Sequence, residues 1–262
     1  MKHSGMKRPH RLLRFLIFFC AAGVVCSALV LLSCRREDAE GEAAYRQIRR
    51  SCTAPSSEKT AGSVRSSPEE KNDPKPDTVN FDALKQINPD TAAWISADGT
   101  PLNYPVVRGK NNAYYLNHLF TGKRGRMGTL FLDFRCSGDF SDSNTILYGH
   151  NMKDGSMFAF LERYKQQSGY DRTPTMRLNT PSGGFTVELF AGTVVDGSRE
   201  SVPLRFAGCS DFLKYTAALK RESTFHSDVS VAAGDRIVTL CTCTSAFQNA
   251  RYALFGKLVP DP

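Results

Sequence analysis

The stretch that decides the fold is Ile237-Val-Thr-Leu-Cys-Thr-Cys243, together with Arg251-Tyr-Ala-Leu-Phe-Gly-Lys-Leu-Val259, which follows after a short polar loop. Both runs are apolar and rich in residues that favour extended backbone. Two such runs joined by a short loop predict a pair of β-strands at the end of the chain. The first run ends in a cysteine, and the second opens with an arginine.

A third apolar run, Thr145-Ile-Leu-Tyr-Gly-His150, lies upstream and ends in a histidine. Cys243, His150 and Arg251 therefore stand at the ends of neighbouring predicted strands. A cysteine can act as a nucleophile, a histidine as a proton carrier, and an arginine as a donor to a developing oxyanion. The three residues predict a thiol acyl-transfer site.

Short apolar runs recur over the last two thirds of the chain. Strands are predicted at 102–107, 128–133, 145–148, 185–195, 237–243 and 251–259. Apolar residues at helical spacing predict helices at 81–87, 156–164 and 210–221. Many short strands with only a few helices predict a mostly antiparallel barrel or sandwich.

The N-terminal region carries much of the net charge of +8. Basic residues flank the nearly uncharged run 15–33, which is long enough to span a bilayer as a helix. Their placement favours a cytoplasmic N-terminus and a domain outside the cell. The charge thus indicates a membrane rather than nucleic acid. Two alternatives stay open: a cleaved signal peptide, and a lipoprotein signal in which Leu31-Leu-Ser-Cys34 is the cleavage box and Cys34 carries the lipid.

We therefore divide the chain into a basic cytoplasmic N-terminus (1–14), a transmembrane signal anchor (15–33), a juxtamembrane segment and linker (34–78) and a catalytic domain (79–262). Residues 35–50 predict a short helix, whereas 51–78 are rich in Ser, Pro, Glu and Lys and predict a linker. Of the eight cysteines, only Cys136, Cys209, Cys241 and Cys243 fall in the domain, which does not indicate a disulfide framework. No metal or other cofactor is indicated.

Several segments resemble sortases, and class B sortases most of all. The Thr-Leu-x-Thr-Cys signature of that family stands here as Thr239-Leu-Cys-Thr-Cys243, with Arg251 eight residues later. Leu147-Tyr-Gly-His-Asn-Met-Lys-Asp-Gly-Ser-Met-Phe158 and Ile87-Asn-Pro-Asp-Thr-Ala-Ala-Trp-Ile95 also match the class B form, as do 102–107 and 128–133. The resemblance spans about 79–262. It implies an eight-stranded β-barrel with an N-terminal helical extension and a helix before the last strands.

The resemblance implies a membrane-anchored cysteine transpeptidase on a Gram-positive surface. Cys243 would attack the carbonyl of a threonine in a sorting motif near the C-terminus of a surface protein, and class B relatives prefer motifs like Asn-Pro-x-Thr. His150 would protonate the departing amine and later help to deprotonate the incoming one. Arg251 would donate to the substrate carbonyl or its oxyanion. The acceptor would be an amine of a cell-wall precursor or a lysine of a pilin.

Four further residues are candidates to bind the substrate: Cys241, Tyr148, Asn151 and Thr242. Cys241 stands where class B enzymes commonly have serine. It is two residues from Cys243 on the same predicted strand, so it should point into the same cleft. It can stand in for the serine, capture an oxidised Cys243 as a local disulfide, or bind a metal with it, although a second ligand pair is missing.

Two other functions use the same chain. A thiol protease or amidase would employ Cys243, His150 and Arg251 with water as the acceptor. An anchored binding protein would keep the barrel without the chemistry, and the presence of all three residue types argues against it.

Overall fold

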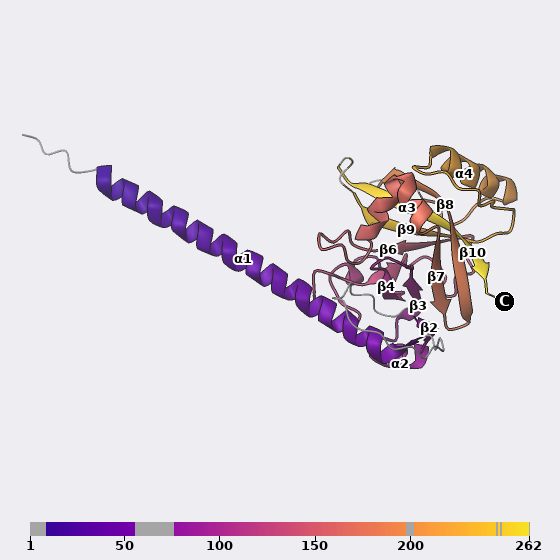
Figure 1. Cartoon of the computed structure of the whole chain (residues 1–262), viewed down its shortest axis with the longest axis horizontal. Coiled ribbons are helices and arrows are strands. Elements are labelled where there is room, and N and C mark those ends of the chain that lie inside the picture. The colour runs from indigo at the N-terminus through magenta and orange to yellow at the C-terminus, as the bar shows by residue number, and fades with distance from the viewer. Residues whose placement is uncertain (1–8, 56–75, 198–201, 245, 247, 262) are drawn as a thin grey trace, which may run out of the picture.

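The fold is built on eight strands. They are β3 (Thr91–Ser96), β4 (Asn103–Val107), β5 (Leu130–Leu132), β6 (Asn144–Tyr148), β7 (Thr175–Thr180), β8 (Gly183–Asp196), β9 (Ile237–Cys243) and β10 (Ala250–Pro260). In the computed structural model, which describes residues 9–55, 76–197, 202–244, 246 and 248–261, they close into a barrel in the order β10-β8-β7-β3-β4-β5-β6-β9 (Figure 1). The expected eight-stranded barrel is confirmed.

Most neighbouring strands of the barrel are antiparallel, but two pairs, β4–β5 and β6–β9, are parallel. The parallel β6–β9 pair is the one that matters for function. Because the two strands run the same way, their carboxyl ends meet at the same end of the barrel.

Side chains of β9 alternate between two apolar clusters. Val238 and Leu240 belong to the cluster that fills the barrel, whereas Ile237 and Cys241 belong to a second cluster outside it. The second cluster includes Phe212 and Leu219 of α4 (Cys209–Glu222), the expected helix before the last strands. The alternation of a strand then puts Cys243 on the outer face, with Cys241.

The remaining short elements connect the strands. α2 (Phe81–Ile87) begins at Asn80, whose side-chain oxygen accepts a hydrogen bond from the Ala83 N–H at 2.9 Å. The helical pattern at 156–164 becomes a 3₁₀-helix, η2 (Ala159–Lys165), which is followed by α3 (Gln167–Arg172). The other elements are η1 (Tyr114–Leu116), β1 (Thr53–Pro55) and β2 (Pro76–Val79), the last two forming a small antiparallel sheet.

α1 (Pro9–Cys52) is a single helix of 44 residues that extends away from the barrel (Figure 1). At 1.5 Å per residue it is about 66 Å long. Its segment Arg14–Cys52 includes an apolar stretch that is long enough to cross a membrane. The large apolar side chains between Phe15 and Leu32 are exposed, so the protein itself does not cover them.

The last turns of α1 belong to the packed domain. Tyr45 is buried in the barrel cluster with Ile48 and Cys52. Its hydroxyl donates to the Gly128 carbonyl at 2.5 Å and lies 3.0 Å from Thr129 Oγ1. Residues 35–50, predicted as a separate short helix, are therefore the end of α1. The boundary drawn at residue 79 stays a prediction, and residues 56–75 of the predicted linker lie outside the described residues.

Candidate active site

The pairing of three strands explains why Cys243 and Arg251 are eight residues apart. β9 and β10 form an antiparallel hairpin in which Cys243 and Arg251 are direct partners, so their side chains project from the same face. β6 lies on the other side of β9, with Tyr148 opposite Cys241. The Gly149 N–H continues the ladder by donating to the Cys241 carbonyl at 3.2 Å. His150 follows directly, at the level of Cys243.

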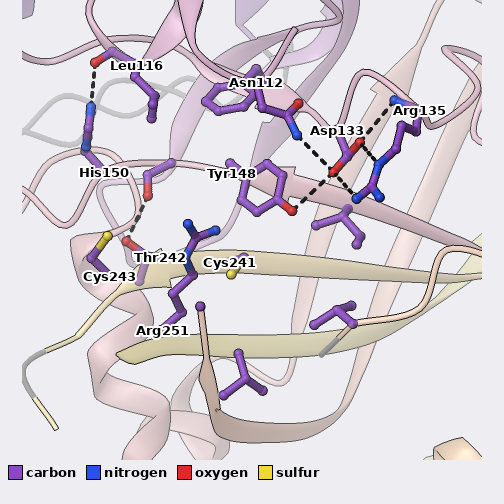
Figure 2. Close-up of a pocket in the computed structure, with 16 residues that line it drawn as sticks. Asn112, Leu116, Asp133, Arg135, Tyr148, His150, Cys241, Thr242, Cys243 and Arg251 are labelled. Carbon is purple, nitrogen blue, oxygen red and sulfur yellow. Dashed lines mark hydrogen bonds and ion pairs between the residues drawn. The ribbon is translucent and has the colours of Figure 1, made fainter. Parts of the chain in front are cut away.

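These strand ends surround a cavity of about 410 Å³ (Figure 2). Six of the seven residues predicted for the site line it: Cys243, His150, Arg251, Cys241, Thr242 and Tyr148. Asn151 lies beside it, and its side-chain amide donates to the Cys243 carbonyl at 2.9 Å. Thr242 is buried, and its hydroxyl donates to the Gly149 carbonyl at 2.8 Å. Asn151 and Thr242 thus connect the ends of β6 and β9.

Cys243 stands at the end of β9, and His150 follows the end of β6. Cys243 is exposed at the end of β9, and its sulfur points to the side of the cavity where His150 lies (Figure 2). His150 Nε2 lies 2.6 Å from the Leu116 carbonyl oxygen of η1. A carbonyl only accepts, so Nε2 must carry the hydrogen in this contact. In the neutral imidazole, Nδ1 then has the free lone pair and is the atom that can exchange a proton.

Arg251 is held by an aromatic ring. Its guanidinium carbon lies 5.5 Å from the centre of the Tyr148 ring, within the range of a cation–π contact. The Tyr148 hydroxyl donates to Asp133 Oδ2 at 3.2 Å. Asp133 also accepts from Arg135 Nε at 2.9 Å and from Asn112 Nδ2 at 3.0 Å (Figure 2). A buried carboxylate therefore fixes the tyrosine that supports Arg251.

The ionisation of this network follows from its surroundings. Burial raises the pKa of the Tyr148 hydroxyl above its usual value, and the negative charge of Asp133 adds to the effect. Burial also acts to raise the pKa of Asp133, but hydrogen bonds from Arg135 and Asn112 outweigh it and hold the pKa below its usual value. Asp133 is thus a carboxylate and Tyr148 a neutral donor at neutral pH.

Comparison with known proteins gives the family. No protein-family model matches the chain. The chain is 36% identical over 178 residues to Sortase B of Listeria monocytogenes, an alignment that covers 67% of this chain and 72% of that protein. This chain belongs to the class B sortases. Sortase B of Staphylococcus aureus is 35% identical over 181 residues, with 68% and 74% covered.

Solved structures agree with this assignment. The Staphylococcus aureus sortase B–substrate complex matches this sortase with a TM-score of 0.66 and 34% identity, covering 70% of this chain and 86% of that one. A sortase B complexed with triglycine matches with the same TM-score, identity and coverage. The chain is therefore a sortase B-type cysteine transpeptidase.

Cys241 lies in the wall of this sortase's cavity and is 3% exposed. Burial raises the pKa of its thiol to about 11, although the neighbouring Arg251 acts to lower it. Like-facing residues of an extended strand are about 6.8 Å apart, at the upper end of the Cα separations that disulfides span. A Cys241–Cys243 disulfide would therefore require the end of β9 to bend. The neutral thiol fits the predicted place of a serine in the wall.

Three residues of the site were not among the predicted site residues: Asp133, Asn112 and Leu116. Asp133 ends an apolar run that predicts a strand, which is the only sequence signal for it. Asn112 and Leu116 lie in and near η1, in a stretch without a recognisable motif. Among the residues that the structure describes, no group of three or more His, Cys, Asp or Glu side chains is placed to hold a metal ion.

Proposed function

We propose that α1 anchors this sortase in the cell membrane with the barrel outside, and that the enzyme cleaves surface proteins after the threonine of a C-terminal sorting motif and transfers the acyl group to an amine. The observation that carries the proposal is the meeting of Cys243, His150 and Arg251 at one cavity, from the ends of three neighbouring strands. The complex of the Staphylococcus relative with a substrate supports it.

In the first half-reaction, the Cys243 thiolate attacks the threonine carbonyl carbon, and the carbonyl oxygen becomes an oxyanion. The Arg251 guanidinium donates hydrogen bonds to this oxyanion; in other acyl-transfer enzymes the loss of one such donor costs about 10²–10³ in rate. When the C–N bond breaks, His150, which took the Cys243 thiol proton on Nδ1 as the thiolate formed, gives that proton to the leaving amine. A thioester between Cys243 and the threonine remains.

In the second half-reaction, the nitrogen of an acceptor amine attacks the thioester carbon. His150 Nδ1, now unprotonated, takes a proton from the attacking nitrogen. The oxyanion forms again beside Arg251, and its collapse expels the Cys243 thiolate and leaves an amide bond. The sortase B complexed with triglycine supports an acceptor with a free terminal amine, such as that of a cell-wall precursor peptide.

The test uses the full chain in detergent with a panel of sorting-motif peptides, including Asn-Pro-x-Thr types, with and without triglycine. Mass spectrometry should show cleavage after threonine and joining to triglycine, both lost in Cys243→Ala. Arg251→Lys, which keeps the charge but loses the planar fork, should be strongly impaired. Hydrolysis without joining would assign a thiol protease instead. An inert Cys243 with no turnover would assign an anchored binding protein.

A further inference from the structure

A second cavity of about 400 Å³ lies outside the catalytic site. It forms where the turn after β3 meets η2 and α3. Its floor is aromatic, from Phe160 and Tyr164, and both side chains are buried. Its polar rim consists of Thr100, Arg163, Gln166, Ser168 and Arg172.

The second cavity opens at the same end of the barrel as Cys243. β3 is antiparallel to β4, β4 is parallel to β5, and β5 is antiparallel to β6, so β3 and β6 run the same way. The turn after β3 is therefore at the end of the barrel where β6 delivers His150. η2 separates the two cavities: Lys165 of η2 donates to the Thr244 hydroxyl, next to Cys243.

The charged side chains that line the second cavity are both positive. Arg163 and Arg172 are the charged residues that line it, and within the described part of the chain neither guanidinium forms an ion pair or a hydrogen bond. Three carboxylates lie on the elements that form the cavity, and each has a partner. Glu162 accepts from Lys165 at 2.6 Å, Asp171 accepts from Gln167 at 2.9 Å, and Asp98, in the turn after β3, has an interaction of its own. The two guanidinium groups are thus available to a ligand.

The neutral rim residues add further donors. The side chains of Gln166 and Ser168 also lack a hydrogen-bond partner among the residues that the structure describes. Four donor side chains therefore border one hollow. A guanidinium presents a planar fork that fits the oxygens of phosphate, and hydroxyl and amide donors complete the coordination of a tetrahedral anion. A carboxylate ligand has only two oxygens, too few to accept hydrogen bonds from all four side chains, so a phosphate-type anion fits the cavity better.

We propose that the second cavity is a binding site for a phosphate-type oxyanion. The anion can come from a soluble phosphate-bearing ligand or from a lipid headgroup, since the chemistry that recognises both is the same. If the proposed function holds, a phosphorylated acceptor bound there would lie on the catalytic end of the barrel, across η2 from Cys243. The binding site itself does not depend on that function.

The first experiment is calorimetric titration of inorganic pyrophosphate into the full-length Cys243→Ala chain in zwitterionic detergent, so that turnover plays no part. Saturable binding is expected. Arg163→Gln and Arg172→Gln should each weaken it about tenfold. The double variant Lys214→Gln/Arg221→Gln removes two positive charges from α4, as many as both cavity substitutions together, and should bind normally. Absence of saturable binding, or equal weakening in the α4 control, would overturn the proposal.

The second experiment identifies the source of the anion. The same titration is made in nanodiscs of phosphatidylcholine and in nanodiscs that also contain phosphatidylglycerol. If pyrophosphate binds more weakly in the nanodiscs that contain phosphatidylglycerol, this lipid competes for Arg163 and Arg172, and the site takes a lipid headgroup. If the affinities agree in both discs, it takes a soluble ligand. If phosphatidylglycerol still competes with pyrophosphate to the same extent in the double variant Arg163→Gln/Arg172→Gln, the anion binds elsewhere and the proposal is wrong. A failed transpeptidation assay would leave all of these readouts unaffected.

Discussion

Replacing Gly197 with alanine should reduce transpeptidation by about a hundredfold, mainly through Arg251. Gly197 follows β8 and lines the cavity that holds Cys243 and His150. Its N–H donates to the Asn249 carbonyl at 2.9 Å, which brings its backbone against the Arg251 side chain. A Cβ at position 197 would lie 2.5 Å from Arg251 Nε, 2.9 Å from Arg251 Cδ and 2.7 Å from the Asn249 carbonyl oxygen.

The size of the effect follows from these distances. Ordinary contact begins at 3.4 Å, so Arg251 Nε has to move by about 0.9 Å in a closely packed wall. A displacement of about 1 Å at a catalytic group can cost 10²-fold in rate. The complete loss of an oxyanion donor costs about 10²–10³, which sets the upper limit for Gly197→Ala. Cys243 ends β9 and His150 follows β6, so both lie away from this contact and should keep their reactivity.

The assay is a double-mutant cycle in kcat/KM for peptide cleavage. Gly197→Ala should cost about a hundredfold in the wild type and far less when Arg251→Ala is already present, because two changes that act on one group do not add. The contact with the Asn249 carbonyl remains in both backgrounds. Gly208→Ala is the matched control, since a Cβ there meets no atom within 4 Å. An equal loss with and without Arg251 would refute the reasoning, and so would unchanged activity.

At neutral pH, iodoacetamide should alkylate Cys243 and spare Cys241, whose thiol is buried and has its pKa raised by burial to about 11; peptide mapping would expose any label on Cys241. Asp133→Asn should lower the free energy of unfolding by about 1.5–3 kcal/mol at pH 7. The pKa of Asp133 is lower in the folded state than in the unfolded state, where it is about 4. Its contribution to stability is therefore complete above the unfolded-state pKa and is lost as pH falls through the folded-state pKa. Urea unfolding should therefore show a smaller difference from wild type at pH 3 than at pH 7, and equal differences would contradict the argument. Tyr45→Phe should cost about 1–3 kcal/mol by leaving the Gly128 carbonyl without its donor, whereas unchanged urea unfolding would mean that this hydrogen bond does not help α1 to stabilise the domain.

The strands that carry the site could be predicted because their sequences are locally decisive. The runs at 237–243 and 251–259 became β9 and β10 nearly residue for residue. The length of the connection between two hairpin strands fixes their register, so the spacing of eight residues between Cys243 and Arg251 is consistent with their direct pairing. β7 escaped prediction because Thr175-Met-Arg-Leu-Asn-Thr180 holds only two large apolar residues, and its position depends on pairing with β3 and β8.

Long-range contacts explain what the sequence did not reveal. Residues 35–50 are charged and rich in alanine, so they resemble a solvated helix, yet Tyr45 and Ile48 are buried because the barrel offers them a partner surface. Asp133 is likewise an ordinary carboxylate in sequence. It gains its importance only when the fold brings Asn112 and Tyr148 to it from separate segments.

The unbroken α1 helix fixes both the height of the barrel along the helix axis and its rotation about that axis, which a flexible tether would leave undefined. The end of the helix is packed into the domain through Tyr45, so helix and barrel move together. Each residue inserted into the helix would therefore shift the barrel by about 1.5 Å along the helix axis and rotate it by about 100°. Seven inserted residues would add about 10 Å of height with almost no turn, whereas two would turn the catalytic cavity to the opposite side at nearly the same height. If α1 anchors the enzyme in the membrane as proposed, the length of this one helix would set both the distance of the cavity from the membrane and the direction in which the cavity faces.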